Sequence, residues 1–136
     1  DPYLIAPTLV LAMAQRLVKK MCPGAGKAIP VEGAIKMGLE KQFEDLPAEF
    51  RGRVPFGKNV FEASATPECA AGTKGRTGVF EAFRMDKELE QIILKEPTEP
   101  AIFKHLRAKG MLTMREDAIM KAFQQQVPFE EVNGLV

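Results

Sequence analysis

The chain has 136 residues, 46% of them hydrophobic, which is enough for one ordinary domain with a core of its own. Its 19 basic and 18 acidic residues leave a formal charge of +1, so no broad electrostatic argument favours a nucleic-acid partner or an anionic membrane. Two cysteines do not make a secreted disulfide scaffold. We therefore expect a cytoplasmic protein without a signal sequence or a membrane-spanning helix.

The first predicted element is a buried helix over residues 3–21. This stretch is apolar nearly all round, which is typical of a buried helix, and the lysines near its end suit the negative pole of a helix dipole. Arg16 is the exception, because an arginine on a buried helix needs a partner. A salt bridge to a neighbouring carboxylate is the simpler interpretation. The opening Asp-Pro, which leads directly into an apolar run, indicates a fragment of a longer protein.

A second helix is predicted from Pro30 to Asp45, with proline at its first position. Its buried stripe recurs every fourth residue and consists of Val31, Ile35, Leu39 and Phe43. One further helical turn is expected over residues 46–50, and a surface loop over residues 51–58.

Two strands are predicted in the middle of the chain, over residues 60–64 and 79–85, and we expect them to pair as a two-stranded ribbon. Between them lie three glycines within seven residues, Gly72, Gly75 and Gly78, which indicate a tight knuckle. Lys74 and Arg76 on this glycine-rich loop raise the alternative of phosphate binding. The pattern is not Gly-x-x-x-x-Gly-Lys-Ser/Thr, however, and a structural knuckle is favoured.

A helical cap is predicted after residue 85, with helices over residues 86–94, 100–110, 113–126 and 128–134. Asp86 is expected to be the N-cap of the first helix. Thr113 and Glu116 have the spacing of a capping box that begins the third. His105 falls off the apolar face of its helix, so we expect it in solvent. The predicted inward positions are Leu89, Ile92, Ile93, Ile102, Phe103, Leu106, Ala118, Ile119, Ala122, Phe123, Phe129 and Val132.

These elements predict a mainly α fold of the α+β class. No set of residues supports catalysis by itself, because the chain has one histidine and no nucleophile beside a base. Phosphoryl transfer needs a phosphate cradle with its lysine, a magnesium-holding serine or threonine and a Walker-B-type acid, and the sequence contains none of these motifs. We expect no catalytic residue and no ATP hydrolysis from this stretch alone.

Three stretches resemble one protein family. Residues 72–81 read Gly-x-x-Gly-Arg-x-Gly-Val-x-Glu, and this is similar to the segment after the tetracysteine zinc motif of the ATPases that drive type II secretion and type IV pilus assembly. Residues 2–23 resemble the family's last ATPase-domain helix running into the first cysteine pair. Residues 109–117 and 128–132 resemble its closing helices. The three stretches occur in the family's order and spacing and cover almost the whole chain.

The resemblance places Cys22-Pro-Gly-Ala25 where the family has Cys-Pro-x-Cys, and Thr66 and Cys69 at the second pair. Each pair has kept one cysteine and lost one. Structural zinc takes four protein ligands, and His105 lies in a different predicted helix, so we expect no zinc and regard Cys22 and Cys69 as vestigial ligands. The two cysteines can still be neighbours, either as a reduced pair or as an adventitious disulfide.

The resemblance implies three parts: residues 1–21 as the last helix of an upstream ATPase domain, 22–85 as a degenerate zinc-knuckle subdomain, and 86–136 as a helical subdomain. The longer protein would be a hexameric ATPase that binds ATP and Mg²⁺ at the cytoplasmic face of the inner membrane. It would push an inner-membrane platform protein and so add pilin or pseudopilin subunits to a filament.

On this basis the chain is a part for packing and motion transmission, in contact with the upstream ATPase domain and neighbouring subunits. Arg16 would lie near the nucleotide pocket, and Arg76 and Glu81 would hold the knuckle. The simpler alternative for Arg76 and Glu81 is a solvated pair. A stand-alone helical protein–protein interaction module is the alternative function. A zinc-ribbon-like nucleic-acid binder is disfavoured by the missing ligands and the near-neutral charge.

Overall fold

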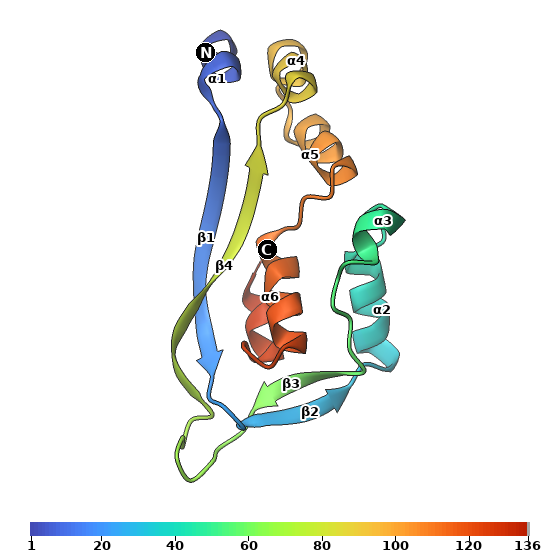
Figure 1. Cartoon of the computed structure of the whole chain (residues 1–136). Coiled ribbons are helices and arrows are strands. Elements are labelled where there is room, and N and C mark those ends of the chain that lie inside the picture. Colours follow the sequence, from blue (N-terminus) through green and yellow to red (C-terminus); the bar gives the residue numbers. More distant parts are fainter. Residues whose placement is uncertain (136) are drawn as a thin grey trace.

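The computed structural model describes residues 1–135 and confirms the α+β class (Figure 1). The elements, in chain order, are α1 (Pro2–Thr8), β1 (Leu11–Met21), β2 (Gly26–Pro30), α2 (Gly33–Gln42), α3 (Ala48–Arg51), β3 (Asn59–Ala63), β4 (Thr73–Arg84), α4 (Lys87–Lys95), α5 (Glu99–Ala108), α6 (Met114–Phe123) and the short 3-10 helix η1 (Phe129–Gly134).

The strands form two antiparallel ribbons. Strand β1 pairs with β4, from Leu11 opposite Arg84 to Met21 opposite Thr73, and β2 pairs with β3. The short ribbon extends sideways from the lower end of the long one, below α6 and towards α2, in Figure 1. The predicted pairing of residues 60–64 with residues 79–85 is therefore wrong. Both strands exist, but each pairs with a strand that was not predicted.

The predicted buried helix over residues 3–21 is also wrong. Helix α1 ends at Thr8, and its C-cap, Leu9, is extended. From Leu11 the chain runs as a strand along β4, and this long-range pairing overrides the local helical preference. Most side chains of β1 are exposed and only Val18 and Met21 are buried, so the apolar character of the stretch does not reflect burial inside this chain.

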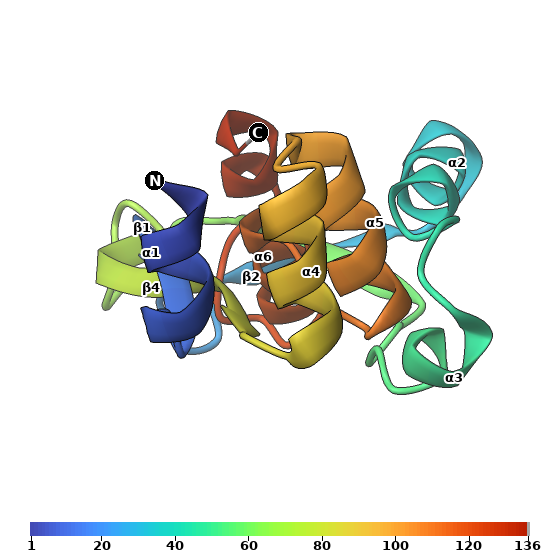
Figure 2. The same cartoon turned by 90° about the horizontal axis from the view of Figure 1, so that it is seen from above.

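Three helices gather at one end of the long ribbon. Helix α1 packs against α4, and α4 packs against α5, as the view from above shows (Figure 2). A small core fills the space between these helices and consists of Ala6, Leu89, Ile93 and Leu106. Leu89, Ile93 and Leu106 were predicted to face inward, so the apolar periodicity of α4 and α5 identified their buried faces correctly.

The main core lies around α6, which packs between the long ribbon and α2 (Figure 1). It contains Val18 and Val79 from the ribbon, Leu39 and Phe43 from α2, and Ile119 from α6. These residues come from all three segments that the resemblance implies. The three segments thus contribute to one shared core.

Several local predictions are confirmed. Asp86 accepts a hydrogen bond from the Leu89 amide at 2.7 Å, and the Thr113–Glu116 capping box is present at the start of α6. Helix α2 is shorter than predicted, because Pro30 ends β2 and the helix begins only at Gly33.

Candidate functional site

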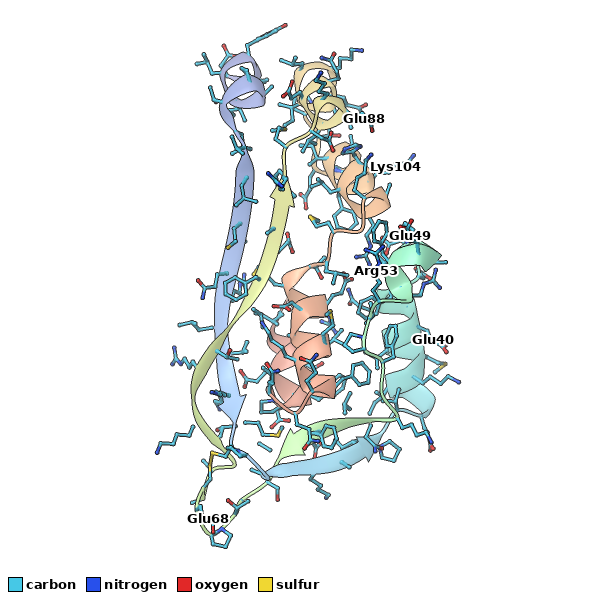
Figure 3. The ribbon with its side chains drawn as sticks, in the orientation of Figure 1. Glu40, Glu49, Arg53, Glu68, Glu88 and Lys104 are labelled. Atoms are coloured by element: carbon cyan, nitrogen blue, oxygen red, sulfur yellow. A yellow bond between two sulfur atoms is a disulfide. The ribbon has the colours of Figure 1, made fainter. Side chains whose placement is uncertain are left out.

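The two cysteines meet where the ribbons join. Residues 22–25 lead from β1 to β2, and residues 64–72 lead from β3 to β4 at the same end of the molecule. Cys22 and Cys69 form a disulfide there, with their Cα atoms 6.6 Å apart. Figure 3 shows the sulfur–sulfur bond beside the loop that carries Glu68. Of the two states that the sequence left open, a reduced pair and a disulfide, the structure has the disulfide. We call residues 22–25 and 64–72 together the ribbon joint.

Main-chain hydrogen bonds connect the two halves of the ribbon joint. The Cys22 amide donates to the Gly72 carbonyl at 3.0 Å, and the Ser64 amide donates to the Ala25 carbonyl at 2.8 Å. Thr66 and Cys69 exchange a pair of main-chain hydrogen bonds. Ala25 and Thr66, the positions compared with the family's other two cysteines, therefore lie in the same joint.

The glycine-rich stretch is divided between the joint and β4. Gly72 has φ +70°, and a Cβ atom there would lie 2.7 Å from the main-chain nitrogen and oxygen of Ser64, so this turn requires glycine. Gly75 and Gly78 lie inside β4, which begins at Thr73. The predicted knuckle is therefore shorter than expected. At Gly78 the ring of Phe80 covers the bare backbone, with Cζ 2.8 Å from the place of a Cβ.

The charged residues of this stretch lie on β4 rather than on a loop. Lys74 and Arg76 are exposed positions of β4, so they do not lie on the glycine-rich loop that a phosphate site would need. Arg76 is opposite Lys19 in the ribbon. Glu81 accepts a hydrogen bond from the Met114 amide at 3.1 Å, and it therefore holds the start of α6 rather than the knuckle.

Two further charged residues attach α6 to β4, and the sequence interpretation missed them. Asp117 accepts from the Phe80 amide at 2.9 Å. Lys121 donates to the Gly78 carbonyl at 2.7 Å and forms an ion pair with Asp117 at 2.8 Å. The one sequence signal was their spacing of four residues with opposite charge, which is typical of a pair on one helix face.

Arg16 lies on the exposed surface of β1, opposite Val79. It forms no ion pair within residues 1–135, so the expected salt bridge inside this chain is wrong. The reason for expecting one was burial on a helix, and neither the helix nor the burial is present.

His105 was expected in solvent, and this prediction is wrong. Its side chain is 9% exposed, with Nε2 2.9 Å from an Asp86 oxygen and Nδ1 3.6 Å from a Glu88 oxygen. The hydrogen bond from His105 and a second from the Leu89 amide lower the pKa of Asp86 below its ordinary value of 3.8. The His105 side chain lies outside the apolar face of α5, as predicted, but it is buried there against Asp86, the N-cap of α4.

The exposed large apolar side chains concentrate on α1, β1 and the link between them: Tyr3, Leu4, Ile5, Val10, Leu11, Met13 and Leu17. Side chains two residues apart on a strand share a face, so Leu11, Met13 and Leu17 point to the same side of the long ribbon. Phe80 lies opposite Gln15 and joins that side. We call Leu11, Met13, Leu17 and Phe80 the apolar ribbon face. These side chains are 40% to 61% exposed. A contiguous apolar surface of this kind is typical of a protein–protein interface.

The family model for a type II/IV secretion system protein matches residues 1–134. The chain belongs to this family. It is similar to the type II secretion system ATPase E of Vibrio cholerae, with 32% identity over 133 residues that make up 97% of this chain and 24% of the relative. It is also similar to the type IV pilus assembly ATPase PilB of Pseudomonas aeruginosa, with 30% identity over 96% of this chain and 22% of the relative. The PilB of Thermus thermophilus is 28% identical over 97% of this chain and 14% of the relative.

This member of the type II/IV secretion system family thus spans less than a quarter of the length of these relatives. None of the helices described in the structure is long and apolar enough to span a membrane. In the described part of the chain, no three or more His, Cys, Asp or Glu side chains form a cluster that could hold a metal ion. The two features that stand out are the disulfide-linked ribbon joint and the apolar ribbon face.

Proposed function

We propose that this chain is the C-terminal part of a hexameric ATPase that powers type IV pilus assembly or type II protein secretion, and that it serves subunit packing and transmission of motion. Family membership and the relatives named as ATPases support this proposal. The apolar ribbon face carries it, because such a surface stabilises a protein only when another surface removes it from water.

The edge of β1 supports the same conclusion. Strand β1 has β4 on one side, and no strand pairs with its other side in the two-stranded sheet. Near the end of β1, the Lys19 amide donates to Glu131 at 3.0 Å and the Met21 amide donates to the Gln126 carbonyl at 2.9 Å. Among residues 1–135, no such partner reaches this edge from Leu11 to Leu17, and an open edge is a template for another strand. The upstream ATPase domain would supply that strand and cover the apolar ribbon face.

In this arrangement ATP and Mg²⁺ are held by residues outside this chain. Arg16 lies on the same strand, on the face opposite the apolar ribbon face, and has no ion-pair partner within residues 1–135. It would approach the nucleotide pocket, or a carboxylate beside it, from that side. Zinc is not expected, because the two cysteine sulfurs are bonded to each other and a structural zinc site takes four ligands.

The outer surfaces of α2 and α3 would face neighbouring subunits or the inner-membrane platform protein. They and the turn after α3 carry charged side chains that point away from the core, among them Glu40, Glu49 and Arg53 (Figure 3). Exposed charges of both signs are typical of the rim of an interface, where they favour encounter and orientation more than affinity.

The experiment compares the protein encoded by the longer reading frame with a variant that carries Met13→Glu and Leu17→Glu. We expect the variant to lose its hexamer in light scattering and most of its ATP hydrolysis, because two buried charges would oppose docking. Ala108→Glu is the matched control, since Ala108 is exposed on α5 and lies outside the apolar ribbon face and outside α2 and α3. An intact, fully active hexamer in the double variant contradicts the proposal.

The alternative, a stand-alone helical interaction module, makes the opposite prediction. It requires a reading frame without Walker motifs ahead of Asp1 and a 136-residue chain that is a stable monomer by itself.

A further inference from the structure

The ribbon joint consists of two connecting segments that lie side by side. The chain passes through it twice, first over residues 22–25 and again over residues 64–72, and each passage connects one strand of the long ribbon to one strand of the short ribbon. The angle between the two ribbons therefore depends on how these two passages are fixed to each other. The Cys22–Cys69 disulfide is the covalent connection between them.

Little else holds the second passage in place. Two main-chain hydrogen bonds cross the joint, from Cys22 to Gly72 and from Ser64 to Ala25. The apolar cluster at the joint is small, with Met21, Cys22 and Ala25 buried and Phe61 and Cys69 packed at its margin. Most side chains from residue 64 to residue 72 are exposed. A segment with so few buried contacts has low local stability once a covalent tie is removed.

The joint also touches the turn that follows α6. The Met21 amide donates to the Gln126 carbonyl at 2.9 Å, and the side chain of Gln125 approaches Gly26. Gln125 has φ +59°, the one positive value at a non-glycine position in the described chain. Such a conformation persists only when its surroundings hold it. A change in the conformation of the joint would thus alter the contacts that hold the turn after α6.

We propose that Cys22 and Cys69 are a redox-controlled lock, which fixes the ribbon joint when oxidised and frees residues 64–72 when reduced. This inference is independent of the proposed ATPase function. Cys22 is buried while Cys69 is partly exposed, so Cys69 is the sulfur that an external thiol or disulfide reaches first.

The chemistry needs a small disulfide as oxidant, such as oxidised glutathione. The Cys69 thiolate attacks one sulfur of the oxidant, the sulfur–sulfur bond of the oxidant breaks, and one glutathione thiolate leaves. The Cys22 thiolate then attacks Cys69 in the mixed disulfide and the second glutathione leaves. The pair loses two electrons and two protons, and the oxidant becomes two thiols. A dithiol reductant reverses both steps.

Cleavage at Glu68 tests the lock in the intact 136-residue chain. Glu68 lies at the outer end of the joint, next to the disulfide (Figure 3), and a glutamyl endopeptidase cuts after it. We expect cleavage after Glu68 to be about tenfold faster after reduction, because cutting requires local opening. Cleavage after Glu44, in the exposed turn between α2 and α3, is the internal control and should not change.

The variant with Cys22→Ser and Cys69→Ser is the second arm, and it should be cut in both buffers at the rate of the reduced wild type. The wild-type comparison uses one polypeptide in two redox states, so it remains decisive even if the variant does not fold. Equal cleavage rates in the two states overturn the proposal. Two free thiols after treatment with oxidised glutathione, shown by alkylation and mass spectrometry, overturn it as well.

Discussion

Arg107 and Glu116 form a two-pronged ion pair inside the protein, with Nη1 2.6 Å from Oε1 and Nη2 2.9 Å from Oε2. Their side chains are 4% and 1% exposed. Burial by itself would lower the pKa of Arg107, but the bonds to Glu116 and Asp45 outweigh it and raise the pKa above its usual value. Glu116 also closes the capping box with Thr113. One carboxylate thus serves both the start of α6 and the attachment of α5.

Glu116→Gln should destabilise the fold by about 3–5 kcal/mol, because it leaves the buried Arg107 charge without its main partner. Urea unfolding followed by circular dichroism measures the change. Glu40→Gln is the control, since the pair that Glu40 forms with Lys36 at 3.9 Å is exposed. That change should be less than about 0.5 kcal/mol. Similar losses for the two variants would mean that the buried pair is not a major support of the fold.

The same substitution should have opposite effects at two glycines. Gly72→Ala should destabilise by more than about 1 kcal/mol, because φ is +70° and the new Cβ would meet the Ser64 backbone at 2.7 Å. Gly38 lies inside α2 with open space where a Cβ would be, so Gly38→Ala should stabilise by about 0.5–1 kcal/mol. Thermal unfolding of both variants beside the wild type gives the two signs. A neutral Gly72→Ala would count against the described turn.

Asp86 should make the stability of the protein depend on pH in the acid range. Its folded-state pKa is lowered, first by the hydrogen bond from His105, so its contribution is present above its ordinary pKa of 3.8 and is lost as the pH falls through the folded-state value. Asp86→Asn keeps the helix cap but removes this titration. The difference in unfolding free energy between the two proteins should therefore shrink below a pH of about 4.

His105→Gln provides a second measurement of the same interaction. Removing the histidine should raise the pKa of the Asp86 carboxyl towards 3.8, which NMR titration of that carboxyl can follow. Parallel stability curves for wild type and Asp86→Asn, together with an unchanged carboxyl pKa in His105→Gln, would contradict the assigned contact.

A metal chelator should leave the melting temperature unchanged. The positions compared with the family's zinc ligands supply only the sulfurs of Cys22 and Cys69, and two sulfurs do not complete a structural zinc site. Calorimetry with and without EDTA, together with metal analysis of the purified chain, gives the result. Stoichiometric zinc, or a lower melting temperature in EDTA, would refute the expectation.

The sequence predicted what depends on neighbours along the chain. The cap formed by Asp86 and the box formed by Thr113 and Glu116 are patterns of four residues, and both are present. The buried stripe ending at Leu39 and Phe43 was likewise recognised from its period, and both residues belong to the main core.

What failed depends on partners far away in the chain. Strand β1 is an edge strand whose apolar side chains are mostly exposed, so its sequence lacks the polar and apolar alternation that usually reveals a strand. Its partner, β4, is about sixty residues away, and no local pattern joins them. His105 was misplaced for the same reason, because Asp86 belongs to the preceding helix.

The attachment of α6 to its two sides has a mechanical consequence. Glu81, Asp117 and Lys121 fix this helix along β4, and the Glu116–Arg107–Asp45 chain of contacts continues from it to the end of α2. A force applied to the long ribbon would therefore be transmitted to α2 through these charged side-chain contacts. The molecule would then deform mainly at the ribbon joint, where the buried apolar cluster is small.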